Sequence, residues 1–462
     1  KKQFCRVPCA GYMKMLKSEI KKKRTGLCAK SSAEMGKSMK LYLKNIGKID
    51  EAMVEIDGIT VIAGENDTGK STVGKALFSV FNSCCGIDEL IKSERTKSVE
   101  KIIARMQRNE AAHSYLVKYP EDAARDLLLE IELLKDNSKL IREEVVKWML
   151  QYNQRANGFL NDDNIDGLAL QIEELLNIPD EDILKLVLEK NLKMEFNGQI
   201  SNIYAQSMSE IRLQIKDKEM TITIEDNSVK DTRNHTNLHT EAVYLDDPFI
   251  LDEPRYPFTK YKSNYMNHRM RLKNNILYGN GEEPVNIVEE LVVNNKFKKI
   301  YEKIGTVCDG NFVIHKVSGI GYRGKNSDKT LDVRNLSTGL KTFAILKMLL
   351  QNGMIEYNGT IILDEPEIHL HPEWQLLFAE LIVLLHKEFS MHILLNTHSP
   401  YFLRAIQVYS ARYGTADRCR YYLSEAEGNY AYISDVTDDV EKIYSKLSRP
   451  LQRLENERWQ DD

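Results

Sequence analysis

The sequence lacks long apolar runs, paired cysteines and abundant proline. No apolar stretch approaches the roughly 20 residues that a membrane-spanning helix needs, and no signal peptide is visible. The seven cysteines are scattered and form no CxxC pair, which argues against a disulfide framework or a zinc hook. With 11 prolines, 42% apolar residues and 29% charged residues, the composition is that of an ordinary globular protein. We therefore expect a cytoplasmic protein that does not bind a membrane.

The charge is unevenly distributed along the chain. Residues 1–38 carry a net charge of plus 9, so the remaining residues sum to minus 13 within the overall charge of minus 4. A basic arm of this kind could contact nucleic acid, but it shows no periodicity, and we expect a disordered leader over 1–38. The acidic remainder argues against broad binding to duplex DNA, so DNA stays a candidate partner only through a local basic patch.

At 462 residues, the chain is long enough for two domains or for one domain with a large insertion. Polar and apolar residues alternate from Leu41 to Ala63, which predicts two antiparallel strands that lead into a buried strand. A glycine-rich loop follows, and residues 72–83 have the spacing of a helix. The segment 39–86 is therefore predicted to form an α/β unit of strand, loop and helix.

The middle of the chain has a different composition. It is rich in Leu, Ile, Lys and Glu without a sustained heptad, so we expect a compact helical insertion over 87–197 rather than a coiled coil. Strands and helices should mix over 198–332, and α/β structure should return over 333–434 before a polar helical tail at 435–462. The elements expected between the insertion and the last α/β part are a hairpin over 209–226, a strand that leads into a loop within 241–250, helices from about 282 and a strand near 311–317.

The segment "GENDTGKST" at 64–72 fits the pattern G-x-x-x-x-G-K-[ST] of a phosphate-binding loop. It follows a β-branched strand and opens a helix, so its backbone amides are expected to point at phosphate oxygens. Lys70 is expected to reach the β- and γ-phosphates of ATP, and Ser71 to hold Mg²⁺. The residues predicted to bind the nucleotide are Gly64, Glu65, Asn66, Asp67, Thr68, Gly69, Lys70, Ser71 and Thr72.

A second motif, "GTIILDEPE" at 359–367, is an apolar strand that ends in two acids. A buried strand would place Asp364 beside the magnesium ion, and Glu365 could then act as the general base on the attacking water. The similar "ILDEP" at 250–254 is a weaker candidate for the magnesium site, because "YLDDPF" interrupts the strand before it. Asp246 or Asp247 could instead lie near the nucleotide, or form a plain turn.

A third motif, "LLNTHSPYFL" at 394–403, is an apolar strand followed by a histidine. A lone histidine at a strand end is usually a structural residue. After a nucleotide strand and an acidic strand, however, His398 is expected to sense the γ-phosphate and to orient the attacking water.

A Ser-Thr-Gly triplet starts another apolar helix within "NLSTGLK", at Ser337, Thr338 and Gly339. A helix N-terminus carries free amides and partial positive charge, so this one suits a γ-phosphate. The chain already has its own phosphate loop. A symmetric dimer would let each Ser337 cover the nucleotide held by the partner's Lys70.

The order of these motifs resembles that of the ABC-type ATPases of the SMC and OLD (overcoming lysogenization defect) group. The likeness lies in "GENDTGKST", "NLSTGLK", "IILDEPEIHLHPEWQ" and "NTHSP", and it covers 39–434 apart from the insertion. The resemblance implies an α/β P-loop NTPase fold, an ABC-type ATPase head with a large helical insertion, and ATP and Mg²⁺ as cofactors. It also implies an N-lobe with the Walker A loop over 39–86, and a C-lobe with signature, Walker B and histidine switch over 333–434.

Some features depart from the pattern of that group. The signature reads LSTG where transporters have LSGGQ, and no Gln loop is recognisable between the first two motifs. The sequence "EIHLHP" is similar to that of OLD and bacterial defence ATPases, where this turn lies at the dimer interface; a metal-binding pair of His369 and His371 is a weaker alternative. Related proteins often carry a Toprim nuclease domain, but the 64 residues after His398 are too few for one.

The resemblance implies a homodimer, or a higher even oligomer, that closes on ATP and opens on hydrolysis. We expect an ATPase that regulates a separate effector protein, a nuclease or a toxin, in the manner of Septu-type anti-phage defence in bacteria. The alternative is a DNA-binding clamp of the SMC or recombination-repair type that acts directly on DNA. The acidic body of the chain and the missing CxxC count against this alternative, and the large insertion and the signature place a transporter subunit third.

Overall fold

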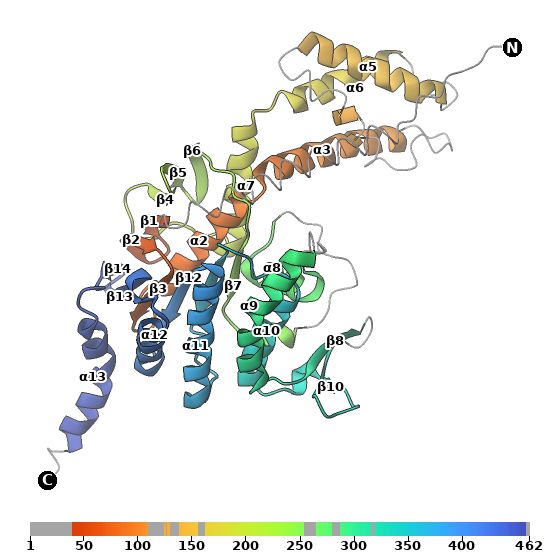
Figure 1. The fold of residues 1–462 in the computed structure, drawn as a ribbon. Helices are drawn as coiled ribbons and strands as arrows, with labels where there is room; N and C mark the ends of the chain where they lie inside the picture. The colour runs from red at the N-terminus through yellow and green to blue at the C-terminus, as the bar shows by residue number, and fades with distance from the viewer. Residues whose placement is uncertain are drawn as a thin grey trace.

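The computed structural model describes residues 39–109, 124–125, 127–129, 138–155, 162–253, 265–279, 287–315 and 319–458, so the predicted leader at 1–38 lies outside the described residues. A central sheet carries helices on both faces, and a group of helices extends from one end of the molecule (Figure 1). The strands are β1 Met39–Ile46, β2 Ile49–Ile56, β3 Ile59–Gly64, β4 Ser209–Ile215, β5 Lys218–Glu225, β6 Ser228–Arg233, β7 Ala242–Leu245, β8 Asn311–His315, β9 Gly319–Arg323, β10 Leu331–Asp332, β11 Thr360–Asp364, β12 His392–Thr397, β13 Cys419–Glu427 and β14 Tyr430–Asp435. The helices are α2 Lys70–Cys84, α3 Ile87–Asn109, α5 Ser138–Arg155, α6 Asp162–Leu176, α7 Asp180–Glu195, α8 His268–Tyr278, α9 Ile287–Gly305, α10 Thr338–Gln351, α11 Pro372–Phe389, α12 Pro400–Tyr413 and α13 Glu441–Arg458, with short 3-10 helices η2 Pro248–Leu251, η3 Val333–Asn335 and η4 Ala416–Arg418.

In the described part of the chain, eleven strands form one sheet in the order β6-β5-β4-β1-β2-β14-β13-β3-β12-β11-β7. Strands β13, β3, β12, β11 and β7 are parallel to one another, whereas β4, β5 and β6 join β1 and β2 in antiparallel pairs. The carboxyl ends of the five parallel strands therefore meet at one edge. In open α/β sheets this edge is where ligands bind.

The beginning of the sheet confirms the alternation that the sequence shows. Strands β1 and β2 pair antiparallel with Met39 opposite Ile56, and their inward side chains are buried. Strand β3 follows with all six residues buried, because helices cover both of its faces. The predicted hairpin over 209–226 is also confirmed, by the antiparallel pair of β4 and β5.

Alternate side chains of the parallel strands pack into two different cores. Ile361 and Leu363 of β11 pack in the core built with α9, α10, α11 and α12. Ile362, between them, packs in the core built with α2 and α7. Because side chains alternate across a strand, these cores lie on opposite faces of the sheet.

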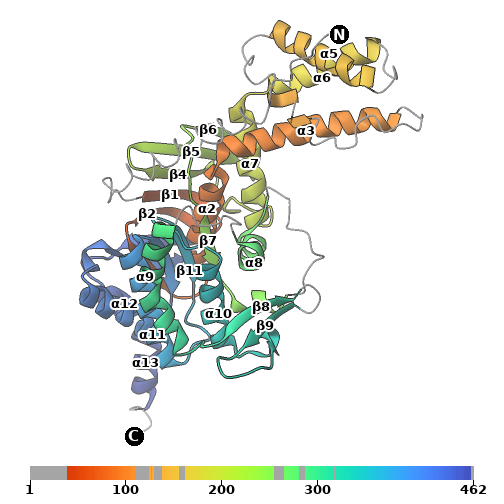
Figure 2. The same cartoon turned by 45° about the vertical axis from the view of Figure 1, so that its right-hand side comes forward.

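Helices α3, α5 and α6 have a separate core of their own. It includes Ile103 of α3, Trp148 of α5 and Ile172 of α6. Helix α7 instead packs on α2 and β6, and so links these helices to the sheet (Figure 2). The predicted bounds of the insertion, 87–197, and of the other parts of the chain stay predictions.

Helix α8 corrects the expectation that helices resume only at about residue 282. It spans His268–Tyr278, and Asn267 caps it by accepting a hydrogen bond from the amide of Met270 at 2.9 Å. Its sequence, "HRMRLKNNILY", has no clear apolar stripe, and ion pairs add to its packing: Arg271 Nη1, for example, lies 2.5 Å from Glu241 Oε1. No helix in the described part of the chain is both long and apolar enough to cross a membrane.

Candidate functional site

The loop at 64–72 connects the buried strand β3 to helix α2. A Cβ on Gly64 would lie 2.2 Å from the backbone oxygen of Ser424, so a larger residue would displace the backbone. Gly69 precedes the helix with a φ of 87°, which side chains of L-residues rarely permit. Ser424 Oγ donates to the oxygen of Thr68 at 2.5 Å, and Thr68 Oγ1 donates to the oxygen of Glu65 at 2.9 Å. Strand β13 and the loop's own hydrogen bonds therefore fix its shape.

Lys70, the first residue of α2, is buried within this loop. Its Nζ donates to the backbone oxygens of Gly64 at 3.2 Å and Glu65 at 2.6 Å, and lies 3.9 Å from Glu365 Oε1. Burial lowers the pKa of Lys70, although the charges of Glu365 and Asp364 oppose this shift. The ammonium group thus lies at the carboxyl end of β3, where a phosphate-binding lysine is needed.

The motif that ends in Asp364 and Glu365 lies close to the loop, because β11 pairs with β12 and β12 pairs with β3. Asp364 is buried, and its two oxygens accept hydrogen bonds from Asn396 Nδ2 at 2.9 Å and from the Tyr244 hydroxyl at 3.0 Å. Glu365 follows with a φ of 49°, in the left-handed region that residues other than glycine seldom occupy. Strain of this kind is concentrated at functional sites, and here the Glu365 carboxylate faces Lys70.

His398, which follows β12, completes a line of contacts at this edge. Its Nδ1 lies 3.1 Å from Glu365 Oε1, the oxygen that also faces Lys70. This pairing raises the pKa of His398 and lowers the pKa of Glu365. The buried carboxylate of Glu367 accepts hydrogen bonds from Thr397 Oγ1 and, at 3.3 Å, from the amide of His398. Glu365 is thus kept ionised, with the imidazole held against it.

The remaining predicted nucleotide residues line the outer side of the same loop. Two ion pairs hold it: Lys48 Nζ lies 2.5 Å from Asp67 Oδ2, and Lys446 Nζ of α13 lies 3.9 Å from Glu65 Oε2. The exposed members are Glu65, Asn66, Asp67 and Ser71, and Thr72 is partly exposed. The structure thus brings the loop together with Asp364, Glu365 and His398, while the roles assigned to these residues stay predictions.

The signature triplet lines a cavity that is separate from the loop at 64–72. Ser337, Thr338 and Gly339 line a cavity of about 440 Å³ together with His369, His371 and Trp374, and no residue of the 64–72 loop lines it. A Cβ on Gly339 would lie 2.9 Å from the backbone oxygen of His369, so the helix start approaches this turn closely. No third metal-binding side chain joins the two histidines among the residues that the structure describes.

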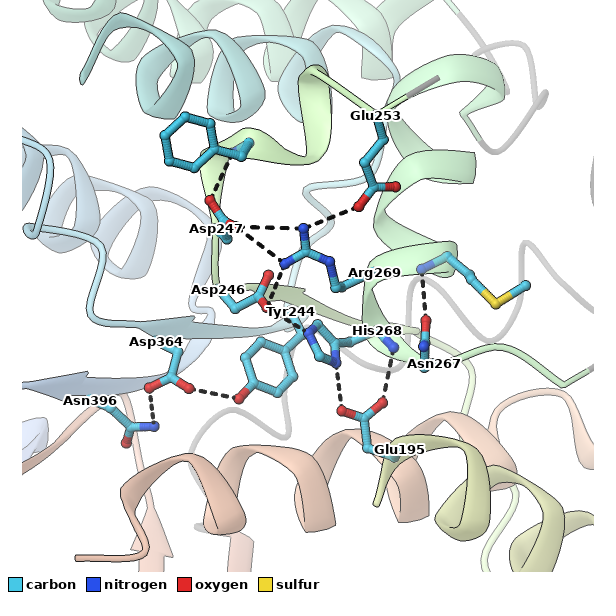
Figure 3. Close-up of polar contacts among 12 residues, drawn as sticks. Glu195, Tyr244, Asp246, Asp247, Glu253, Asn267, His268, Arg269, Asp364 and Asn396 are labelled. Atoms are coloured by element: carbon cyan, nitrogen blue, oxygen red, sulfur yellow. Dashed lines mark hydrogen bonds and ion pairs between the residues drawn. The ribbon is translucent and has the colours of Figure 1, made fainter. Parts of the chain in front are cut away.

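The structure adds a charged cluster that the sequence did not reveal (Figure 3). Asp246 follows β7, the parallel neighbour of β11, so it reaches the same edge as Asp364. Its Oδ2 lies 2.9 Å from His268 Nε2 and 3.0 Å from Arg269 Nη1. Burial opposes the charge on His268, but hydrogen bonds with Asp246 and Glu195 raise its pKa to about 9. Burial likewise works against the charge of Asp246, yet the hydrogen bond from His268 leaves its pKa lowered.

The two other acidic candidates of this region are engaged by other partners. Asp247 caps η2 by accepting a hydrogen bond from the amide of Phe249 at 2.8 Å. Asp252 of "ILDEP" ends η2, which is no strand, and its Oδ1 lies 2.7 Å from Lys341 Nζ on α10.

The residues at this edge suit a magnesium ion. Ser71, Asp246 and Asp364 line one cavity of about 410 Å³. The buried Oδ1 of Asp246 accepts no hydrogen bond from any residue that the structure describes. Mg²⁺ prefers oxygen ligands, which these hydroxyl and carboxylate groups provide.

Comparison with known proteins places the chain in a family. Solved structures that are similar to it include the SMC head domain from Thermotoga maritima, with 11% identity, a TM-score of 0.35, and coverage of 87% of this chain and 99% of that chain. The SmcHead bound to the C-winged helix domain of ScpA has 12% identity, a TM-score of 0.40, and coverage of 86% and 97%. The Smc head domain with an extended coiled coil bound to the C-terminal domain of ScpA, derived from Pyrococcus furiosus, has 12% identity, a TM-score of 0.34, and coverage of 90% and 100%.

A family match covers most of the chain, residues 59–404. With the parallel strand order and the loop between β3 and α2, it confirms the expected fold class, a P-loop NTPase of the ABC type. The chain belongs to the ATPase family described as "AAA domain, putative AbiEii toxin, Type IV TA system".

Proposed function

We propose that this chain binds ATP with Mg²⁺, hydrolyses it at a site completed by a second copy, and controls a separate effector protein through the resulting closure. The observation that carries the proposal is a line of contacts at the carboxyl ends of parallel strands. Glu365 Oε1 lies 3.9 Å from Lys70 Nζ and 3.1 Å from His398 Nδ1. Membership of an AAA ATPase family supports it.

Each residue at this edge has its own chemical task. Lys70 binds the phosphates through its ammonium group, and Ser71 and Asp364 hold Mg²⁺, whose charge stabilises the negative charge that develops on the phosphate oxygens. Glu365 accepts the proton of the attacking water, because its carboxylate is ionised. His398 holds that carboxylate in place through Nδ1 and helps to orient the water.

The signature triplet at the start of α10 is the reason for proposing a second copy. The N-terminus of α10 offers free amides to an anion, yet Ser337 makes no side-chain capping bond and lines an open cavity. Exposed apolar side chains, Ile368 and Leu376, flank the nearby turn and support an interface there. We infer that Ser337, Thr338 and Gly339 close over the nucleotide of the other copy in a homodimer or a higher even oligomer.

The setting we propose is bacterial anti-phage defence in the cytoplasm. The turn "EIHLHP" is similar to that of OLD and Septu-type defence ATPases, and the family description names a putative toxin of a Type IV TA system. The partner would be a nuclease or a toxin. The helices α3, α5 and α6 have their own core and extend from the sheet, which suits them to hold this partner (Figure 1).

The first test compares ATP binding and turnover in the unmodified protein and in Glu365→Gln. Loss of a general base typically slows a reaction by about 10²- to 10⁴-fold, so the variant should bind ATP but barely hydrolyse it. Glu302→Gln, on the exposed side of α9, is the matched control and should turn over normally. Normal turnover by Glu365→Gln would remove Glu365 as the base.

A second test separates the effector from DNA. Tagged Glu365→Gln protein would be recovered from its native cells with Mg-ATP, and the bound molecules identified by mass spectrometry and by nuclease sensitivity. A stoichiometric protein partner that survives nuclease treatment supports the regulated effector. Recovery of DNA alone would instead favour the clamp that acts directly on DNA.

A further inference from the structure

The last residue of α7 connects the helical part of the chain to the nucleotide edge. Glu195 is almost fully buried, with 1% of its side chain exposed. Its Oε2 accepts a hydrogen bond from the amide of His268 at 2.9 Å, and its Oε1 lies 2.5 Å from His268 Nδ1. The other ring nitrogen of His268 lies 2.9 Å from Asp246 Oδ2. The imidazole is therefore fixed at both nitrogens, by carboxylates from α7 and from the end of β7 (Figure 3).

The same imidazole packs flat on Tyr244. The two ring centroids are 4.4 Å apart with an interplanar angle of 26°, and Phe78 of α2 packs edge-on against both rings. Tyr244 is fully buried, and its hydroxyl donates to Asp364 Oδ2 at 3.0 Å. Burial, together with the charge of Asp364, raises the pKa of Tyr244 well above its usual value, so the hydroxyl stays a donor.

Asp364 is thus oriented from two sides. The Tyr244 hydroxyl fixes Oδ2, and Asn396 Nδ2 fixes Oδ1 at 2.9 Å. Partners of this kind orient a metal-binding carboxylate and tune its affinity for the ion. Asn396 lies on β12 inside the sheet, whereas Tyr244 is the contact that leads, through His268, to Glu195 and α7.

We propose that Tyr244 and His268 are positioning residues that set the magnesium-binding carboxylates Asp364 and Asp246, and that Glu195 links their position to helix α7. This inference rests on the proposed function. A partner that shifts α7 would change how Asp364 is presented to the ion, and would thereby regulate the ATPase from the helical part of the chain.

The first test removes the Tyr244 hydroxyl in a Glu365→Gln background, where bound ATP is not hydrolysed. Mn²⁺ serves as the probe, and its affinity for the ATP-bound protein is measured by electron paramagnetic resonance. Tyr244→Phe should weaken Mn²⁺ binding by about 10- to 100-fold, as expected for loss of a group that orients a metal ligand. ATP affinity measured without metal should not change, because the Tyr244 hydroxyl donates to Asp364 and not to the loop at 64–72. Tyr42→Phe is the matched control, since its hydroxyl donates to Glu51 on β2.

The link to α7 is tested by Glu195→Gln, which keeps the shape of the side chain and removes its charge. We expect weaker Mn²⁺ binding again, by a smaller factor, while His386→Gln, at a buried histidine of α11, should leave it unchanged. Equal Mn²⁺ affinity in Tyr244→Phe and its parent overturns the inference and leaves the proposed function intact. A parent protein that binds no Mn²⁺ with ATP would overturn both.

Discussion

Helices α2 and α10 both begin with residues suited to a phosphate, but their surroundings differ. Helix α2 begins at the buried Lys70, whose Nζ lies among backbone oxygens and 3.9 Å from Glu365. Helix α10 begins after the exposed Ser337, beside a cavity of about 440 Å³ lined by two histidines and a tryptophan. Within the part of the chain that the structure describes, no acidic side chain lines that cavity.

The difference between the two helix starts is one of chemistry. Each offers free amides and partial positive charge to an anion. Only α2 has the proposed base, Glu365, and a candidate magnesium ligand, Asp364, at the same edge of the sheet. The start of α10 can therefore help to bind a phosphate but cannot by itself cleave one, which is why we propose that two copies supply the two halves.

The largest effect should come from removing the charge at α2. Lys70→Ala deletes the ammonium group that we propose contacts the phosphates, and each hydrogen bond to a charged group contributes about 1.5–3 kcal/mol, or roughly 10- to 150-fold in affinity. ATP binding measured by calorimetry should weaken by at least that factor, and turnover should be lost. Lys299→Ala, at an exposed site on α9, is the control. ATP affinity like that of the unmodified protein would exclude 64–72 as the phosphate loop.

A change at α10 should separate binding from closure. Ser337→Arg places a bulky cation where the helix start should meet the nucleotide of the other copy, so ATP should still bind at Lys70. The rise in mass with ATP, measured by light scattering in a Glu365→Gln background, should be lost. Ser445→Arg, on the exposed face of α13, should still show that rise. A mass increase that survives Ser337→Arg would contradict the composite site.

Mixing the two inactive variants makes the comparison sharper. In a dimer of one Lys70→Ala copy and one Ser337→Arg copy, one site has both intact halves and the other has neither. With random pairing, an equal mixture should recover about a quarter of the unmodified activity, because half of the dimers are mixed and each has one working site. No recovery would mean that both helix starts serve the nucleotide of their own chain.

The sequence predicted the elements that local spacing determines. The strand, loop and helix around Lys70 follow a fixed pattern, and the acidic strand at Asp364 lies beside it because buried parallel strands align their carboxyl ends. Helix α8 escaped prediction, because tertiary ion pairs such as that of Arg271 with Glu241 replace an apolar stripe.

The cluster around His268 could not be found from spacing. His268 is 22 residues from Asp246 and 73 residues from Glu195, and only the packing of α7, β7 and α8 brings the three together. The one local signal was an acidic pair after the apolar run "AVYL", which the sequence alone could not distinguish from a plain turn. This part of the site is formed by contacts between distant segments and not by a sequence motif.

The smallest effect should come from the exposed ion pair at the loop that precedes α2. Lys48 Nζ lies 2.5 Å from Asp67 Oδ2, but 84% of the Asp67 side chain is exposed, so water and salt weaken the attraction. Exposed pairs of this kind contribute about 0.2–1 kcal/mol, and Lys48→Ala should lower the free energy of unfolding by no more than that. Denaturant titration at low and high salt measures this change, which should shrink as salt rises. A larger loss of stability would contradict the weak, exposed pair, whereas a loss of ATP affinity near that of Lys70→Ala would show that Lys48 binds the nucleotide.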